Sequence, residues 1–191
     1  MNYNFCTAVG VVESFDIEIQ TDTKVPVAEV SIFSRETDSW ALKVLVAIVE
    51  DVDQKKAQNL SKGDIVFFTG KPTVMDGYNI ILSNSFVILK KNKLDLPIEM
   101  CKISSLEYAN LENVAAVAGK VCALHDSTIN LIVKRNNFHM RGELTDNDYV
   151  RVTPTNSLSV KEGDFIVCIG QINEVGIEGM VAIIESMEED F

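Results

Sequence analysis

One short pattern occurs twice in this chain, one hundred positions apart. Residues 60–70 read LSKGDIVFFTG and residues 160–170 read VKEGDFIVCIG, so in both a Gly-Asp pair is followed by another glycine. A second match lies upstream of each, where residues 8–12 (AVGVV) correspond to residues 117–121 (VAGKV). Such self-similarity predicts two copies of one structural unit. The alternative is a chance similarity between two segments rich in strand-forming residues.

The first unit has the pattern of a small β-structure with one helix. Apolar and β-branched runs predict strands, and an Asp-Gly pair between the last two runs predicts a hairpin. A segment of mixed charged and apolar residues, ended by the turn at residues 61–64, suits a short helix. The predicted elements are strands over residues 5–13, 25–35 and 40–50, a helix over 51–60, and strands over 65–71 and 78–90.

This order of elements is typical of one architecture. Three strands, one helix and two strands within about 90 residues is the order of the OB-fold, a five-stranded Greek-key barrel. Closing a barrel requires glycines where strands bend sharply, and Gly10 and Gly70 are suitably placed on the first and fourth strands.

The second unit is shorter than the first. Gly10 and Gly63 are 53 positions apart, whereas Gly119 and Gly163 are 44 apart. The shortening falls where the first unit has its helix, because residues 153–157 (TPTNS) are typical of a loop. We therefore predict an all-β protein of two tandem OB-fold barrels, with a short helix in the first. The expected boundaries are residues 1–93 for the first domain, 94–111 for a connecting helix or strap, and 112–191 for the second domain.

Motifs for catalysis or for cofactor binding are missing. The chain has no Walker loop, no GxGxxG and no GxSxG elbow. Cys6, Cys101, Cys122 and Cys168 are scattered singly, without the CxxC or CxxH spacing of a zinc site, and are expected to be buried thiols. We expect no catalytic residue, no metal and no cofactor. Without a long apolar run or a signal peptide, the protein is expected in the cytoplasm and not in a membrane.

The net charge of −11 opposes binding to nucleic acid, but its distribution is uneven. Residues 1–93 contain ten basic and twelve acidic side chains, whereas residues 112–191 contain six basic and thirteen acidic ones. A nearly neutral first unit can carry a positive groove even though the whole chain is acidic.

Sequence-tolerant binding of single-stranded nucleic acid uses aromatic rings that stack on bases and cations that contact phosphates. The first unit offers both kinds of side chain along its predicted second and third strands and near the hairpin. The second unit offers them in the segment KRNNFHMR. The alternatives are core positions for the rings and a charged hairpin turn for the second segment. The candidate residues are Phe33, Arg35, Trp40, Lys43, Lys71, Tyr78, Lys134, Arg135, Phe138 and Arg141.

Residues 5–90 resemble the bacterial single-stranded DNA-binding proteins (SSB). The matching segments are VAEVSI at residues 27–32, Trp40 followed by Val-Leu-Val, and AQNLSKGDIVFFTG at residues 57–70. The resemblance implies that Trp40 stacks on a base. Some lineages of this family carry two barrels per chain and form dimers, so the resemblance allows a homodimer.

The C-terminus is similar to the acidic tip with which SSB proteins recruit replication and repair enzymes. This resemblance implies that the ring of Phe191 fills a pocket of the partner and that the carboxylates before it contact basic residues of the partner. The alternative is a charged tail that only ends the last strand. The residues concerned are Glu188, Glu189, Asp190 and Phe191.

The sequence therefore predicts a nonenzymatic protein that binds single-stranded DNA, protects it and recruits partners in replication, recombination or repair. The alternative is a scaffold in a replication, plasmid or phage assembly whose barrels bind proteins and not DNA. Binding of RNA is a third option, and an enzyme is the last.

Overall fold

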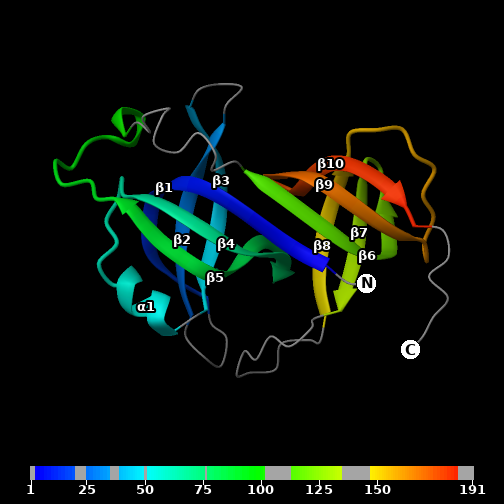
Figure 1. Cartoon of the computed structure of the whole chain (residues 1–191), viewed down its shortest axis with the longest axis horizontal. Coiled ribbons are helices and arrows are strands. Elements are labelled where there is room, and N and C mark those ends of the chain that lie inside the picture. Colours follow the sequence, from blue (N-terminus) through cyan, green and yellow to red (C-terminus); the bar gives the residue numbers. More distant parts are fainter. Residues whose placement is uncertain are drawn as a thin grey trace.

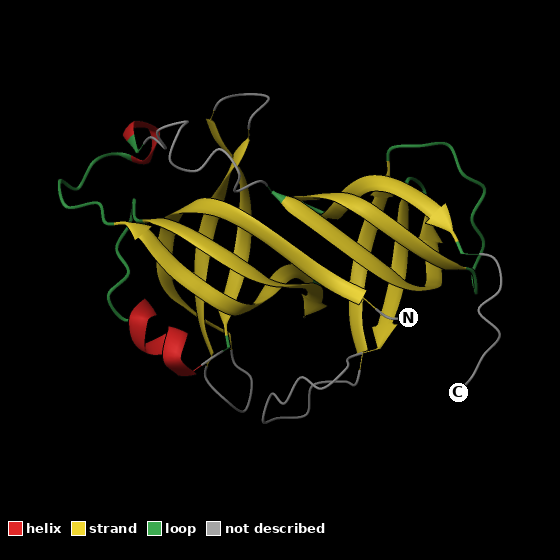
Figure 2. Ribbon diagram, in the orientation of Figure 1, coloured by secondary structure: helices red, strands yellow, loops and turns green. Residues whose placement is uncertain are grey.

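The structure is a computed structural model of the whole chain, and it describes residues 3–19, 25–34, 39–49, 51–75, 77–101, 113–134 and 147–184. It is built mostly of β-strands, with very little helix (Figure 2). The strands gather in two groups side by side (Figure 1). No helix in the described ranges is long and apolar enough to cross a membrane.

The first five strands form a closed barrel, which we call the first ring. β1 pairs with β2 and β4, β2 with β3, and β5 with both β3 and β4. The predicted order of three strands, one helix and two strands is confirmed. The elements are β1 (Tyr3–Ile19), β2 (Val25–Ser34), β3 (Ser39–Ile48), α1 (Asp51–Ala57), β4 (Ile65–Met75) and β5 (Tyr78–Lys90).

Two strands of the first ring are longer than predicted. β1 continues to Ile19 because register shifts after Val12 and after Ser14 let polar residues join the ladder with β2. β4 continues through Pro72 to Met75. Pro72 is tolerated because β1 pairs with β4 only as far as Gly70, which leaves one side of β4 without a ladder beyond that point.

The other five strands form a second circuit of pairings, which we call the second ring. β6 pairs with β7 and β9, β7 with β8, and β10 with both β8 and β9. Residues 155–164, all of them described, contain no helix, as predicted for the shortened unit. The strands are β6 (Val114–His125), β7 (Thr128–Lys134), β8 (Asn147–Pro154), β9 (Phe165–Asn173) and β10 (Gly176–Ile183).

The sequence repeat corresponds to a repeat of hydrogen bonds. In the first ring, the amide of Val12 donates to the Asp64 carbonyl at 2.9 Å, and the amide of Gly63 donates to the Val12 carbonyl at 2.8 Å. In the second ring, Val121, Asp164 and Gly163 form the same two bonds at 2.8 and 2.9 Å. Both turn glycines have positive φ, +82° and +92°. The motif GD therefore closes the same turn against the first strand in both rings.

The glycines predicted at strand bends lie at close backbone crossings. A Cβ on Gly10 would lie 2.9 Å from the Ser31 carbonyl oxygen, and one on Gly70 would lie 2.5 Å from the Leu82 carbonyl oxygen. At such distances only glycine fits without a shift of the backbone.

The two rings are joined through their first strands. β1 pairs with β6 in antiparallel register, and this ladder includes the pair Cys6–Ala115. The repeat relates these same two positions, because each lies four residues before its strand glycine, Gly10 or Gly119. The rings therefore meet across a local two-fold axis at this pair, as two copies of one subunit do in a symmetric dimer. One apolar core cluster includes residues of both rings.

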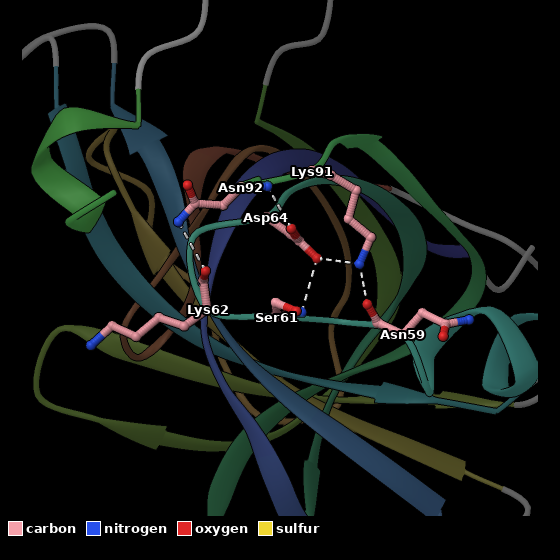
Figure 3. A network of polar contacts seen from close by, with 6 residues as sticks. All are labelled: Asn59, Ser61, Lys62, Asp64, Lys91 and Asn92. Carbon is pink, nitrogen blue, oxygen red and sulfur yellow. Dashed lines mark hydrogen bonds and ion pairs between the residues drawn. The ribbon is translucent and has the colours of Figure 1, made fainter. Parts of the chain in front are cut away.

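A polar network fixes the start of β4 to the chain that follows β5 (Figure 3). The Asp64 side chain is fully buried and accepts hydrogen bonds from the backbone amides of Ser61 and Asn92, at 2.9 and 2.8 Å. Lys91 Nζ lies 2.8 Å from the same carboxylate and also donates to the Asn59 carbonyl. The Asn92 amide group donates to the Lys62 carbonyl. This network sets the direction of residues 93–101 as they leave the first ring.

The prediction of four buried thiols is right for Cys6, Cys101 and Cys168 and wrong for Cys122, which is only half-buried. A register shift between Val121 and Ala123 interrupts the β6–β7 ladder at Cys122. Val117 and Val121 belong to the core, so the alternation of a strand directs Cys122, one position after Val121, away from it.

Candidate functional site

The structure describes six of the predicted site residues, and the others lie outside the described residues. Phe33, Trp40 and Lys43 lie on β2 and β3, Lys71 and Tyr78 on β4 and β5, and Lys134 at the end of β7. The residues outside the described ranges are Arg35, Arg135, Phe138, Arg141, Glu188, Glu189, Asp190 and Phe191. Of the connecting helix or strap predicted over residues 94–111, residues 98–100 form one short 3₁₀ turn, η1 (Ile98–Met100), and residues 102–111 lie outside the described ranges as well.

Trp40 is half-buried and has partners within the protein. Its indole N–H donates to the Cys101 carbonyl at 2.5 Å, and its ring packs against the cluster of Val11, Ile98 and Cys101. The Phe33 ring meets it edge-on, with centroids 5.4 Å apart. The ring of Trp40 therefore holds residues 96–101 against the first ring, and only part of its surface is available to another molecule.

Lys43 is exposed on the outer face of β3, but acidic side chains surround it. Its Nζ lies 3.9 Å from Glu13 Oε1 and 4.0 Å from Glu29 Oε1. The Ser31 hydroxyl donates to the same Glu13 oxygen at 2.6 Å. The two glutamates offset the positive charge of Lys43 on this face of β2 and β3, which weakens its attraction for a phosphate.

A cleft of about 300 Å³ lies between the two rings. The first ring contributes Lys43 and Leu45 of β3 and residues 77–81 of the hairpin, including Tyr78. The second ring contributes Val150, Arg151 and residues 172–174. Tyr78 is 65% exposed at this cleft, so its ring is available for contact with another molecule.

Contacts between the rings fix the walls of the cleft. The Asn79 side-chain amide donates to the Glu174 carbonyl at 2.8 Å, which ties the β4–β5 hairpin to the β9–β10 turn. The buried Asn4 amide donates to the Pro72 carbonyl at 2.8 Å and to Asp148 Oδ2 at 3.3 Å. These hydrogen bonds hold the two walls of the cleft in place.

Two residues that the sequence analysis did not select, Tyr149 and Arg151, lie on the outer face of β8. Val150 and Val152 belong to the core, so the alternation of a strand directs Tyr149 and Arg151 outward. Lys134 is exposed at the end of the neighbouring β7. Alternation of polar and β-branched residues over 149–152 is a usable signal for this outward face, because successive side chains of a strand point to opposite faces.

The four thiols are not activated for chemistry. Burial raises the pKa of Cys6, Cys101 and Cys122, and it raises the pKa of Cys168 to about 11. Thiols with raised pKa values stay protonated at neutral pH and are poor nucleophiles and metal ligands. Within the described ranges, no three His, Cys, Asp or Glu side chains are grouped so that they could hold a metal ion.

Comparison with known proteins gives a likeness in structure only. No family model matches the sequence, and no curated protein matches it. The crystal structure of the wild-type single-stranded DNA binding protein from Thermus aquaticus matches with a TM-score of 0.60 at 12% identity. The match covers 100% of this chain and 97% of that one. A deletion mutant of the same protein matches with the same TM-score and identity, over 98% of its length.

The fold is of the OB type. The likeness extends over both rings, because it covers the whole of this chain and nearly the whole of the Thermus chain. The closed first ring, with its helix between the third and fourth strands, agrees with that assignment.

Proposed function

We propose that this protein is a nonenzymatic single-stranded DNA-binding protein. The observation that carries the proposal is the structural likeness over the whole chain to a protein that is named for binding single-stranded DNA. The cleft supports it, because an exposed tyrosine ring and basic side chains from two rings meet there.

We also infer that the chain consists of two tandem OB barrels. The proposed boundaries are residues 1–93, a connecting segment over 94–111, and residues 112–191. The circuit of pairings over β6–β10 and the repeated GD turn support this division. The end of β5 at Lys90 and the start of β6 at Val114 are compatible with it.

A role in replication, recombination or repair follows from the proposed activity. The protein would cover exposed single strands in the cytoplasm and recruit partner enzymes through Glu188, Glu189, Asp190 and Phe191. The support is chemical: an aromatic ring beside carboxylates is a small anchor with an electrostatic rim.

We propose in addition that two chains pair through the outer face of β1, β6, β9 and β10. Aligned pairs run across this face from Phe5 to Ala116, Ile169 and Met180. Ile169 is 60% exposed and Met180 is 70% exposed. An exposed apolar patch on a sheet marks an interaction surface. We assign a second copy of this chain to it, because a symmetric dimer forms through one patch that both chains contribute.

A titration with labelled oligo-dT of about 30 nucleotides, at low and high salt, tests the main proposal. We expect micromolar or tighter binding that weakens as the salt concentration rises, because bound phosphates release counterions. A duplex of the same length is the control and should bind more weakly. Absence of binding at low salt would contradict the proposal.

The second candidate is a scaffold that binds proteins and not DNA. The pairing of Lys43 with two glutamates favours it, because this pairing reduces the positive potential on the β2–β3 face. For a scaffold, both oligo-dT and the duplex would fail to bind at low salt.

A further inference from the structure

We propose that one nucleotide of the bound strand lies in the cleft between the rings, with its base on Tyr78 and its phosphate beside Arg151. This inference rests on the proposed function and goes further, because it assigns a binding residue to the second ring. A strand held in this way would pass from one ring to the other.

The base is assigned to the first-ring wall. Tyr78 follows directly after the β4–β5 turn, and its ring is 65% exposed. In the OB-fold the loop between these strands borders the ligand-binding face. Leu45, Pro72 and Ile80 supply apolar surface beside the ring. A flat base can therefore stack on Tyr78 with apolar groups at its edge.

The phosphate is assigned to the second-ring wall. Of the two basic side chains that line the cleft, Lys43 is already paired with Glu13 and Glu29. Arg151 forms no ion pair with any residue in the described part of the chain. A guanidinium group binds a phosphate through two parallel hydrogen bonds. Arg151 is therefore the better-suited cation for the strand.

The size and rigidity of the cleft suit one nucleotide. Its volume of about 300 Å³ is at the lower end of the range for small-ligand sites. The bond from Asn79 to Glu174 and the β1–β6 ladder hold the two walls together before any ligand arrives. A preformed site of this kind loses little entropy when it is filled.

The test compares Arg151→Gln with Lys161→Gln by fluorescence anisotropy with a labelled oligo-dT of about 20 nucleotides. Both changes remove one positive charge from the second ring, but Lys161 is exposed in the loop before β9, outside the cleft. We expect Arg151→Gln to weaken binding about tenfold and to lower the slope of log affinity against log salt by about 1, and Lys161→Gln to change affinity less than about twofold. Equal effects of the two changes would overturn the proposal.

A double-mutant cycle with Tyr78→Ala checks that the two residues hold the same nucleotide. If they do, Tyr78→Ala and Arg151→Gln together weaken binding by clearly less than the product of their separate effects. If the double variant instead weakens binding by the full product of the two single effects, the residues contact different points of the DNA strand.

A measurement on the unaltered protein avoids dependence on how the variants fold. Oligo-dT with 5-iodouracil in place of thymine is irradiated in the complex, and the adducts are mapped by mass spectrometry. We expect an adduct on Tyr78, and its absence in a complex that does form overturns the proposal. If the unaltered protein binds no oligo-dT, the proposed function itself fails.

Discussion

At the scale of single residues, Trp40 illustrates how a side chain suited to DNA can be used within the protein. The sequence places an aromatic ring at the start of the third strand, where it could stack on a base. In the structure its N–H donates to the Cys101 carbonyl, and its ring packs on residues 96–101. Stacking of Trp40 on a base stays a prediction, whereas these contacts show that Trp40 stabilises the folded protein.

Trp40→Ala should lower the free energy of unfolding by about 3 kcal/mol, because it removes a large half-buried ring and the donor to the Cys101 carbonyl. Trp40→Phe keeps a ring and should cost about 1 kcal/mol. Urea denaturation measures both values. If Trp40→Ala leaves stability unchanged and weakens binding of oligo-dT, the ring is a stacking surface and not a structural contact.

The thiols should differ in their reactivity toward an alkylating reagent at pH 8. Cys122 is half-buried and should be labelled first, whereas Cys6 and Cys168 are fully buried and should be labelled only after unfolding. Mass spectrometry after short pulses of reagent gives the order. Labelling of Cys168 as fast as that of Cys122 would mean that the second ring opens readily.

Protein stability should also depend on pH through Cys168. Its folded pKa of about 11 is higher than that of an unfolded thiol, so the unfolded chain loses its proton first as the pH rises. The contribution is complete below about pH 8.5 and falls by up to about 1.4 kcal/mol per pH unit between there and pH 11. Cys168→Ala should reduce this slope in urea unfolding at pH 9 and 10. An unchanged slope would mean that other groups cause the loss.

At the scale of the structural elements, the same turn has different surroundings in the two rings. Asp64 in the first ring is fully buried and bonded to Lys91, Asn92 and Ser61. Asp164, its counterpart, is half-buried and accepts a bond from the Lys161 amide at 2.9 Å. Within the described ranges, the first ring thus uses this turn to fix the chain that leaves its last strand, and the second ring does not.

This difference gives a matched pair of variants. Asp64→Ala should lower the free energy of unfolding by about 3 kcal/mol, since it leaves the partly exposed Lys91 and the partly buried Asn92 amide without their acceptor. Asp164→Ala should cost only about 1 kcal/mol. Thermal or urea unfolding measures both. Equal losses of stability in the two variants would show that the bonds from Lys91 and Asn92 to Asp64 add no stability beyond that of the turn.

At the scale of the whole molecule, the β1–β6 ladder fixes how the two rings lie against each other. This arrangement creates both the cleft and the apolar outer face. It brings the hairpin of the first ring against the β9–β10 turn of the second, which forms the cleft. It also joins the outer faces of the two rings into one apolar surface around Phe5 and Ile169.

The proposed dimer can be tested with Met180→Glu. A carboxylate on the apolar face would have to be desolvated in the dimer, so the variant should be a monomer while the unaltered protein is a dimer at about 50 µM. Leu158→Glu changes an exposed leucine in the loop before β9 and should stay dimeric. Light scattering after size-exclusion chromatography gives the mass. A monomeric unaltered protein would contradict the proposal.

The sequence alone determined the local structure of this protein. Alternation of apolar residues and the Asp-Gly pair determine the strands and the β4–β5 hairpin, because these signals act between neighbouring residues. The repeated GD motif predicts two equivalent turns, and the same two hydrogen bonds close both of them. Bulges and the course of β4 past Pro72 were missed, because they depend on which strand lies alongside.

Only the tertiary structure decided which side chains meet. Tyr78 and Arg151 are 73 positions apart and line the same cleft because β1 pairs with β6, a contact that no local pattern specifies. Total charge and composition do not single out Arg151, because they do not say which face of a strand a residue occupies. Likewise, the partners of Trp40 come from a segment about 60 residues further along the chain. Interactions between neighbouring residues determine the strands and turns, whereas packing between elements far apart in the sequence determines which residues form the candidate site.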